Sequence, residues 1–224
     1  TPCQSERLVR TNARLKEGRD LKVLFYGDSI FSGCDASSMY NREPFMPYMH
    51  KLIESALASR STGRVRVDNL AVGGWTVENG RDALFGDVGG HDYSKSYKGY
   101  DLMILSYGMN NAYTPEEEFK AATQKIMETV KEANPDIEIV LVSCMNPNPR
   151  VGWDVNQKYQ GQWLKDIAQM PAWQERTALV DFYQVHKSIL VYKDFSSTTG
   201  NNINHPNDWL IRVYAQNIVR AITE

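Results

Sequence analysis

The sequence has few cysteines, little net charge and no long apolar run. Its three cysteines, Cys3, Cys34 and Cys144, show no spacing typical of a metal site and cannot all pair with one another, so we interpret them as ordinary reduced or buried thiols. A formal net charge of -2 provides no broad basic surface, so we expect no nucleic-acid partner. No stretch approaches the roughly 20 apolar residues that cross a bilayer, so we expect no membrane span.

The length of 224 residues suits one domain with a full core. Residues 1–20 are polar and basic, and we predict that they form an N-terminal arm or the end of a linker. Residues 21–224 contain no repeat, low-complexity tract or linker, and we predict that they form one domain. The odd number of cysteines leaves the compartment open, and a secreted or periplasmic location is favoured over the cytoplasm. No sequence feature specifies an oligomeric state.

Strand-like and helix-like segments alternate along the chain. Short apolar runs predict five strands, within residues 21–27, 65–71, 100–108, 137–144 and 178–182. Helical periodicity predicts helices within residues 44–60, 114–134 and 206–223, and a short one near 77–84; Thr114 is the expected N-cap of the second. This alternation is typical of an α/β fold with a parallel sheet covered by helices on both faces.

In such sheets, ligands bind where loops leave the carboxyl ends of the strands. The predicted strand ends carry chemistry-bearing residues, and a histidine precedes the last helix. These residues are Gly27-Asp28-Ser29, Asn69 with Gly73-Gly74, Gly108 to Asn111, Cys144 to Pro147, and His205.

This set matches the requirements of acyl transfer. A serine hydroxyl such as that of Ser29 needs a base, and the base whose ordinary pKa suits neutral pH is a histidine such as His205. The tetrahedral oxyanion needs preorganised donors. The backbone N–H of Ser29, a close backbone N–H at Gly74 and the side chain of Asn110 can supply them.

The same blocks resemble the SGNH (GDSL-type) hydrolase family. The resemblance rests on Gly27-Asp28-Ser29, on "NLAVGGWT" with Gly74, on Gly108-x-Asn110 and on His205 in "NHPND", and it covers about residues 21–224. It implies a flavodoxin-like three-layer α/β/α fold with about five parallel strands, and ester hydrolysis without metal or cofactor. By resemblance, Ser29 is the nucleophile, His205 is the general base, and Gly74 and Asn110 complete the oxyanion hole with the Ser29 amide.

Two positions depart from the family pattern. The family usually has aspartate three residues before the histidine, where this chain has Asn202, and its third block usually ends in aspartate, where this chain has Asn111. The aspartate normally fixes the tautomer of the histidine. We consider three alternatives for Asn202: a Ser-His dyad oriented by a backbone carbonyl, a replacement carboxylate such as Asp208 or Asp194, and a weakened enzyme.

Simpler interpretations stand beside several of these residues. Ser29 taken alone is typical of a helix N-cap. Asp28 resembles the strand-end aspartate of phosphotransfer domains, although we favour a structural role in the turn. Among the other histidines, His50 and His186 suit structural positions, whereas His91 is a rival base.

Trp75 and Trp153 are candidates for lining a substrate cleft, and core packing explains them equally well. The favoured function is a metal-independent serine esterase that removes a short acyl group, acetyl above all, from a carbohydrate. This preference follows from polar inter-block loops and from the family's carbohydrate O-acetylesterases. The alternatives are a lysophospholipase or thioesterase for longer chains, and a carbohydrate-binding module whose catalysis has been weakened.

Overall fold

The computed structural model describes residues 4–40 and 47–224, so Cys3 and residues 44–46 of the first predicted helix lie outside the described residues. A five-stranded parallel sheet forms the centre, with strand order β2-β1-β5-β6-β7. Its strands are β1 (Leu21–Gly27), β2 (Val65–Asn69), β5 (Leu102–Ser106), β6 (Glu138–Val142) and β7 (Thr177–Val180). The predicted parallel sheet is confirmed, and its order is that of flavodoxin-like folds.

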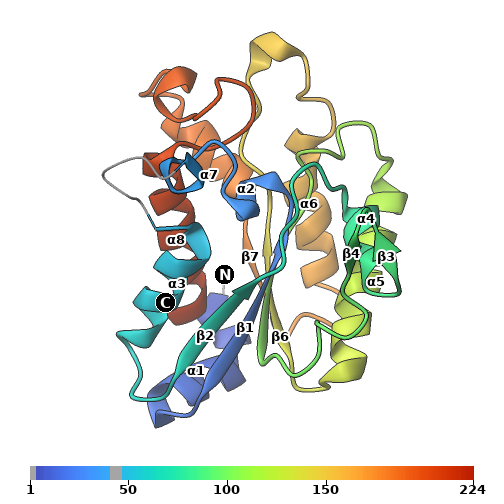
Figure 1. The fold of residues 1–224 in the computed structure, drawn as a ribbon, viewed down its shortest axis with the longest axis vertical. Coiled ribbons are helices and arrows are strands. Elements are labelled where there is room, and N and C mark those ends of the chain that lie inside the picture. Colours follow the sequence, from blue (N-terminus) through green and yellow to red (C-terminus); the bar gives the residue numbers. More distant parts are fainter. Residues whose placement is uncertain (1–3, 41–46) are drawn as a thin grey trace.

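Helices cover both faces of the sheet, which confirms the three-layer α/β/α prediction (Figure 1). One face carries α1 (Val9–Glu17), α3 (Met49–Ala58), α7 (Phe182–Ile189) and α8 (Asp208–Thr223). The other carries α4 (Val77–Ala83), α5 (Glu116–Ala133) and α6 (Gln157–Ala168).

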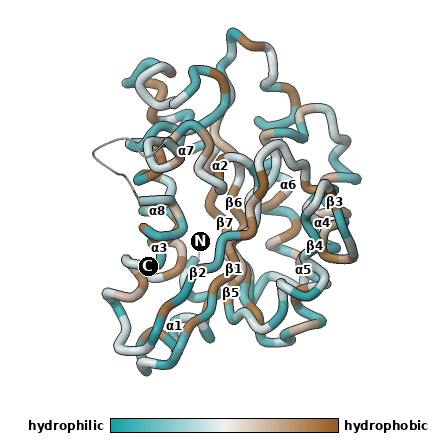
Figure 2. The backbone as a smooth tube through the Cα atoms, viewed as in Figure 1, coloured by the Kyte–Doolittle hydropathy of each residue, from teal (hydrophilic) through white to brown (hydrophobic). Residues whose placement is uncertain are grey.

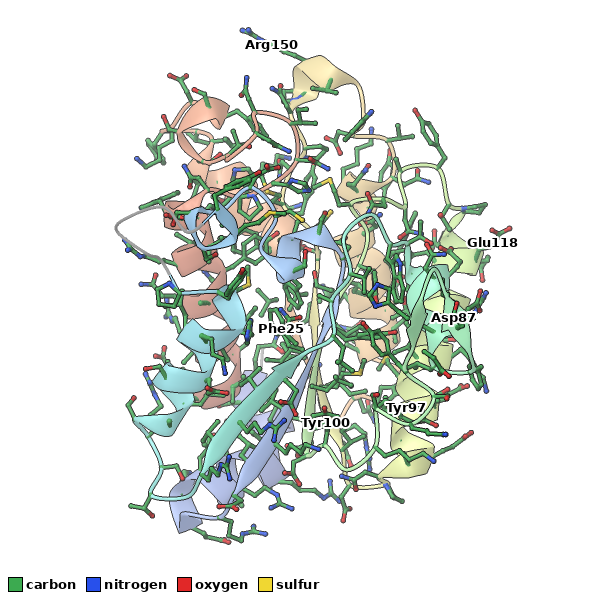
Figure 3. All side chains as sticks on the ribbon, viewed as in Figure 1. Phe25, Asp87, Tyr97, Tyr100, Glu118 and Arg150 are labelled. Atoms are coloured by element: carbon green, nitrogen blue, oxygen red, sulfur yellow. The ribbon has the colours of Figure 1, made fainter. Side chains whose placement is uncertain are left out.

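Each face of the sheet has its own hydrophobic core, and alternate residues of β1 pack into one core or the other. Val23 and Phe25 pack in the cluster under α3 and α8, whereas Leu24 and Tyr26 pack in the cluster under α5 and α6. This alternation follows the two-residue period of a strand, and burial on both faces explains why β1 reads as a continuous apolar run. In Figure 2, hydrophobic residues are concentrated along the central strands. Phe25, labelled in Figure 3, stacks on Phe31 with ring centroids 3.8 Å apart.

The N-terminal segment packs against the sheet layer. The buried carboxylate of Glu138 accepts hydrogen bonds from the backbone N–H groups of Arg10 (2.8 Å) and Thr11 (2.7 Å) in the first turn of α1. This arrangement satisfies donors that a helix leaves free and favours the negative charge. Leu8 and Leu15 are buried in the α3 and α8 cluster. The boundary at residue 20 stays a prediction.

Two local features differ from the expectations. A two-stranded hairpin, β3 (Asp87–Val88) with β4 (His91–Asp92), lies between the short predicted helix and the third predicted strand. No strand was predicted there, because two-residue strands leave no period to read. The expected N-cap Thr114 is wrong: α5 begins one residue later with Pro115 as its N-cap, and the hydroxyl of Thr114 accepts a hydrogen bond from Asn111. The described helices include none with the length and apolar character to span a membrane.

Candidate active site

Ser29 follows the carboxyl end of β1, at the first position of the short helix α2 (Ser29–Ser32). A side chain at Gly27 would place its Cβ 2.3 Å from the carbonyl oxygen of Ser106, so the close packing of β1 on β5 requires glycine there. Asp28 caps α2, since its Oδ1 accepts the N–H of Ile30 at 3.0 Å. The N-cap role is therefore filled by Asp28, and the hydroxyl of Ser29 is available for another partner.

That partner is His205. The Nε2 atom of His205 lies 2.9 Å from the Oγ atom of Ser29, although 176 positions separate the two residues. His205 stands in the loop before α8, and the packing of α8 beside α3 brings this loop to the carboxyl edge of the sheet (Figure 1). The predicted meeting of the serine and the histidine is found in the structure.

The other nitrogen of His205 faces a carboxylate that the sequence did not suggest. Oδ2 of Asp35 lies 2.5 Å from Nδ1 of His205, and Oδ1 of Asp35 accepts a hydrogen bond from the Tyr40 hydroxyl at 2.7 Å. The hydrogen bond to His205 is the main factor that lowers the pKa of Asp35. An ionised carboxylate here accepts the Nδ1 proton, which leaves Nε2 as the acceptor for the serine proton.

The backbone around Asp35 is shaped for this contact. Asp35 has a φ of 61°, in the left-handed region, and follows Gly33, which ends α2 with a φ of 87°. A Cβ at Gly200 would lie 2.3 Å from the carbonyl oxygen of Asp35. Only glycine therefore lets the loop that carries His205 approach so closely.

The position expected for the acid takes a different role. Asn202 has a φ of 58°; its backbone N–H donates to the Thr199 hydroxyl at 3.0 Å, and its carbonyl accepts from Asn148 at 2.7 Å. Its side chain is not a hydrogen-bond partner of His205 among the described residues. Of the alternatives considered for Asn202, the structure favours a replacement carboxylate at Nδ1 of His205, and that carboxylate is Asp35.

Neither Asp208 nor Asp194, the two suggested replacements, contacts His205 among the described residues. Asp208 accepts the backbone N–H of Ser37 at 2.9 Å at the start of α8. Asp194 precedes the short helix η4 (Phe195–Ser197), where its carbonyl accepts from Ser197.

Asn201 organises the loop that carries His205. Its Oδ1 accepts the backbone N–H groups of Ile203 (2.9 Å), Asn204 (3.0 Å) and His205 (3.2 Å). Three donors on one oxygen fix which way the amide is turned. The NH₂ group consequently lies 3.0 Å from Nδ1 of His205 and also helps to lower the pKa of Asp35.

The predicted oxyanion donors come from loops that follow neighbouring strands. An added Cβ at Gly73 would lie 3.9 Å from the Ser29 Cβ, so the loop that carries Gly73 and Gly74 passes beside the serine at Gly73. Gly74 has a φ of 80° and open space at its Cβ position. Within the described chain, the backbone N–H groups of Ser29 and Gly74 donate to no protein acceptor. The Nδ2 atom of Asn110 donates to the Trp75 carbonyl at 2.8 Å, which ties Asn110 to the loop that follows Gly74.

The second departure from the family pattern, Asn111, has a structural explanation. Its Oδ1 accepts the N–H of Val77 at 3.0 Å, while its NH₂ group donates to Glu78 (2.8 Å) and to Thr114 (2.9 Å). An aspartate would lack those two donors and would place a second charge beside Glu78. Asn111 therefore joins the end of β5 to α4, and so fixes the neighbouring Asn110.

The comparisons with known proteins agree with this geometry. The family model of the GDSL-like lipase/acylhydrolase family matches residues 25–209, a span that contains Ser29, Asp35 and His205. The chain belongs to this family. Membership places it in the class of carboxylic ester hydrolases. No match was found among the curated proteins.

Solved structures share the GDSL fold at low identity. A two-domain esterase active on acetylated mannans, co-crystallised with mannopentaose, is 18% identical with a TM-score of 0.72, over 96% of this chain and 52% of that one. The chain thus spans about half the length of that esterase. An acetyl xylan esterase, AlAXEase, is 18% identical with a TM-score of 0.66, over 90% of this chain and 100% of that one. A lipase/acylhydrolase from Enterococcus faecalis is 18% identical with a TM-score of 0.65, over 90% of this chain and 95% of that one.

Asp28 of this GDSL domain is a buried carboxyl group. Burial raises its pKa to about 7, against the opposing effect of backbone N–H groups at Ile30 and Met109. Its Oδ2 has no partner in the described part of the chain. The described residues also contain no group of three or more histidine, cysteine or acidic side chains arranged for a metal ion. The observed contacts of Asp28 are those of a turn and helix cap.

The other histidines lie elsewhere in the GDSL domain. His186 is fully buried: its Nδ1 accepts the N–H of Asn146 at 3.1 Å, and its Nε2 lies 2.9 Å from the Thr198 hydroxyl. His50 contacts Asn69 at 3.2 Å. The rival base His91 lies in β4, where its ring packs 5.5 Å from that of Trp75. Ser29 is paired with none of these three.

The two tryptophans differ in exposure. Trp75 is only 8% exposed and belongs to the core under α5 and α6, so packing accounts for its position. Trp153 is 42% exposed and follows η3 (Pro149–Val151), in the loop whose outer end is marked by Arg150 in Figure 3. The same loop contacts the histidine loop, since Asn148 N–H donates to the Ile203 carbonyl at 2.8 Å. A role for either tryptophan in substrate binding stays a prediction.

Proposed function

We propose that the chain is a serine esterase in which Ser29 is the nucleophile, His205 the general base and Asp35 the acid that orients the base. The observation that carries this proposal is the continuous contact from Ser29 Oγ to His205 Nε2 (2.9 Å) and from His205 Nδ1 to Asp35 Oδ2 (2.5 Å). This arrangement supplies the activated nucleophile that ester hydrolysis requires.

The reaction has two halves. Ser29 Oγ attacks the ester carbonyl while its proton passes to His205 Nε2, and the imidazolium that forms is stabilised by the Asp35 carboxylate. His205 then gives the proton to the leaving alkoxide, which departs as an alcohol and leaves an acyl-serine. A water molecule, deprotonated by His205, attacks the acyl group, and collapse of the second intermediate returns the proton to Ser29 and releases the acid.

The negative charge on the tetrahedral oxygen is stabilised by the N–H groups of Ser29 and Gly74 and by the Asn110 amide. The first two have no competing acceptor in the described chain, and Asn110 is held through Trp75 and through its neighbour Asn111. Donors that are already oriented need no rearrangement as charge develops, which makes such a site effective.

The substrate class we propose is a short-chain ester, acetyl above all, on a carbohydrate. The support comes from the polar residues around Ser29 and from two solved structures of the same fold, an esterase active on acetylated mannans and an acetyl xylan esterase. The carboxylate at His205 Nδ1 also supports a catalytic protein over a weakened binding module, because the weakened-module hypothesis rested on the asparagine at position 202.

Covalent labelling and turnover test this function directly. We expect the protein to hydrolyse p-nitrophenyl acetate and to be labelled by a fluorophosphonate at Ser29, with both activities absent in Ser29→Ala. Ser32→Ala is the matched control, since Ser32 lies on the same helix and, within the described residues, its hydroxyl bonds only to the Ser29 carbonyl and to Cys34. Turnover that is equal in the wild-type protein and Ser29→Ala would refute the proposal.

A further inference from the structure

A pocket of about 490 Å³ lies directly behind the acid of the proposed catalytic site. Its lining includes Asp35, Tyr40, Gly200, Asn207, Asp208 and Trp209. We propose that this pocket binds an uncharged sugar ring of the substrate, next to the ring whose ester is cleaved. This inference rests on the proposed esterase function and adds where, and by which chemistry, a glycan would be held.

The pocket is connected to the reaction site through one side chain. Asp35 lines the pocket and also contacts Nδ1 of His205 through its Oδ2 atom. The Asp35 side chain and the imidazole ring of His205 therefore lie between a ligand in the pocket and Ser29. The volume lies within the range of roughly 300–1,000 Å³ that is usual for small-molecule sites.

Two aromatic side chains give the pocket apolar surface. Tyr40 is 48% exposed and Trp209 is 38% exposed, so both rings have surface that a ligand in the pocket can contact. Such rings combine an apolar face, suited to the C–H face of a sugar, with a polar tip. Lys193, which does not line the pocket, lies 4.9 Å from the centre of the Trp209 ring and so helps to hold the indole in place.

A carboxylate on the pocket wall suits hydroxyl groups. Asp208 is fixed at the start of α8, with Oδ1 accepting the Ser37 N–H at 2.9 Å. Its second oxygen has no hydrogen-bond partner among the residues that the structure describes, and a carboxylate can accept several donors. Hydroxyl donors to a carboxylate form the stronger, charge-assisted class of hydrogen bond.

The charge of the pocket indicates an uncharged ligand. Asp35 and Asp208 both line it, and neither lysine nor arginine is among the described lining residues. Uronic acids and phosphate-bearing headgroups would bring a third negative charge close to these two, which is unfavourable at short range. Neutral hexose or pentose rings carry the required hydroxyl groups without that cost.

The test compares two substrates in each protein. We would measure kcat/KM for acetylated manno-oligosaccharides and xylo-oligosaccharides, and divide each by kcat/KM for p-nitrophenyl acetate, which has no sugar ring. We expect Trp209→Ala to lower this ratio about tenfold, which corresponds to about 1.4 kcal/mol of lost binding. Phe85→Ala is the matched control. Like Trp209, Phe85 is an exposed aromatic residue beside a lysine, since Nζ of Lys125 lies 5.6 Å from the centre of its ring, but it lies on the α4 and α5 side of the molecule, away from the pocket. Its ratio should equal that of the wild-type protein.

The outcomes separate this inference from the proposed function. Normal turnover of p-nitrophenyl acetate, combined with an unchanged ratio in Trp209→Ala or with preference for a glucuronic-acid-bearing oligosaccharide, overturns the sugar pocket and leaves the esterase standing. If p-nitrophenyl acetate is not hydrolysed, the esterase proposal fails, and calorimetric titration of Ser29→Ala with deacetylated oligosaccharides decides the pocket alone. If Ser29→Ala binds these oligosaccharides and the added Trp209→Ala substitution abolishes that binding, the sugar pocket is supported. If Ser29→Ala does not bind them, the sugar pocket is refuted.

Discussion

Asp35 and His205 lie 170 positions apart in the sequence, yet Oδ2 of the one is 2.5 Å from Nδ1 of the other. In the proposed site, the acid therefore follows the nucleophile by six residues instead of preceding the histidine by three. The proposed nucleophile and acid both come from the segment that contains α2 and the turn after it, and the histidine loop contributes only the proposed base. The relation between the nucleophile and the acid is thus fixed mostly by local backbone geometry.

Replacing Asp35 by asparagine should nearly abolish turnover. Asparagine can present its NH₂ group to Nδ1 and so stabilise the wrong tautomer of His205; the same exchange in serine proteases lowers kcat about 10⁴-fold. We expect a loss of about 10³- to 10⁴-fold in kcat for p-nitrophenyl acetate, measured by steady-state kinetics, with an unchanged circular dichroism spectrum.

Asn202→Asp provides the control for this prediction. The backbone of residue 202 is fixed by its φ of 58° and by the hydrogen bonds of its N–H and carbonyl groups. Because this backbone sets the direction of the side chain, a carboxylate at position 202 should not reach His205. We expect wild-type kcat in Asn202→Asp and no rescue in the double variant with Asp35→Asn. Rescue would show that the histidine accepts an acid from its own loop and would contradict the assignment of Asp35.

Asn201 should act as a positioning residue with a signature in the pH profile. In Asn201→Asp, one oxygen can still accept the three backbone N–H groups, but the second replaces an NH₂ group beside His205 and Asp35. A second carboxylate favours the protonated imidazole, which is inactive as a base. The acidic limb of the kcat/KM profile should therefore move to higher pH. A profile that falls in height without moving would mean that Asn201 has only a structural role.

Much of this architecture was predictable from local patterns, because β1, β5 and β6 are apolar runs and α8 has a continuous apolar face. The meeting of Ser29 with His205 was also predictable, since parallel strands place their carboxyl ends at one edge. Asp35 was missed because its contact depends on a left-handed backbone at a non-glycine residue and on the close approach of Gly200. A glycine two residues before an aspartate, just after the nucleophile turn, was the only available signal.

Asn110→Ala should separate turnover from binding. Removal of one oxyanion donor typically lowers kcat by about 10²- to 10³-fold, because the lost interaction forms only as charge develops. We expect this loss with little change in KM for p-nitrophenyl acetate. Since the Asn110 amide also bonds to the Trp75 carbonyl at 2.8 Å, thermal unfolding is measured in parallel. A rise in KM that accounts for the whole loss in kcat/KM would contradict the oxyanion role.

His186 should make the stability of the folded protein depend on pH. Burial lowers its pKa from 6.5 to about 4, so the folded state resists protonation that the unfolded chain accepts. The stabilisation is present above the unfolded pKa and is lost as the pH falls from there toward the folded pKa. From about pH 8 to about pH 5, this single group should reduce the free energy of unfolding by about 2 kcal/mol.

The measurement is a difference between two proteins in urea unfolding at several pH values. His186→Gln can still accept the Asn146 N–H and donate to the Thr198 hydroxyl, but it does not titrate. Asp28 acts in the opposite sense, because its raised pKa lowers stability as the pH rises. This effect is common to both proteins and cancels in the difference. On acidification from about pH 8 to about pH 5, we expect the free energy of unfolding of the wild-type protein to fall by about 2 kcal/mol more than that of His186→Gln. If the free energies of the two proteins change in parallel with pH, His186 titrates equally in the folded and unfolded states, which would contradict the prediction.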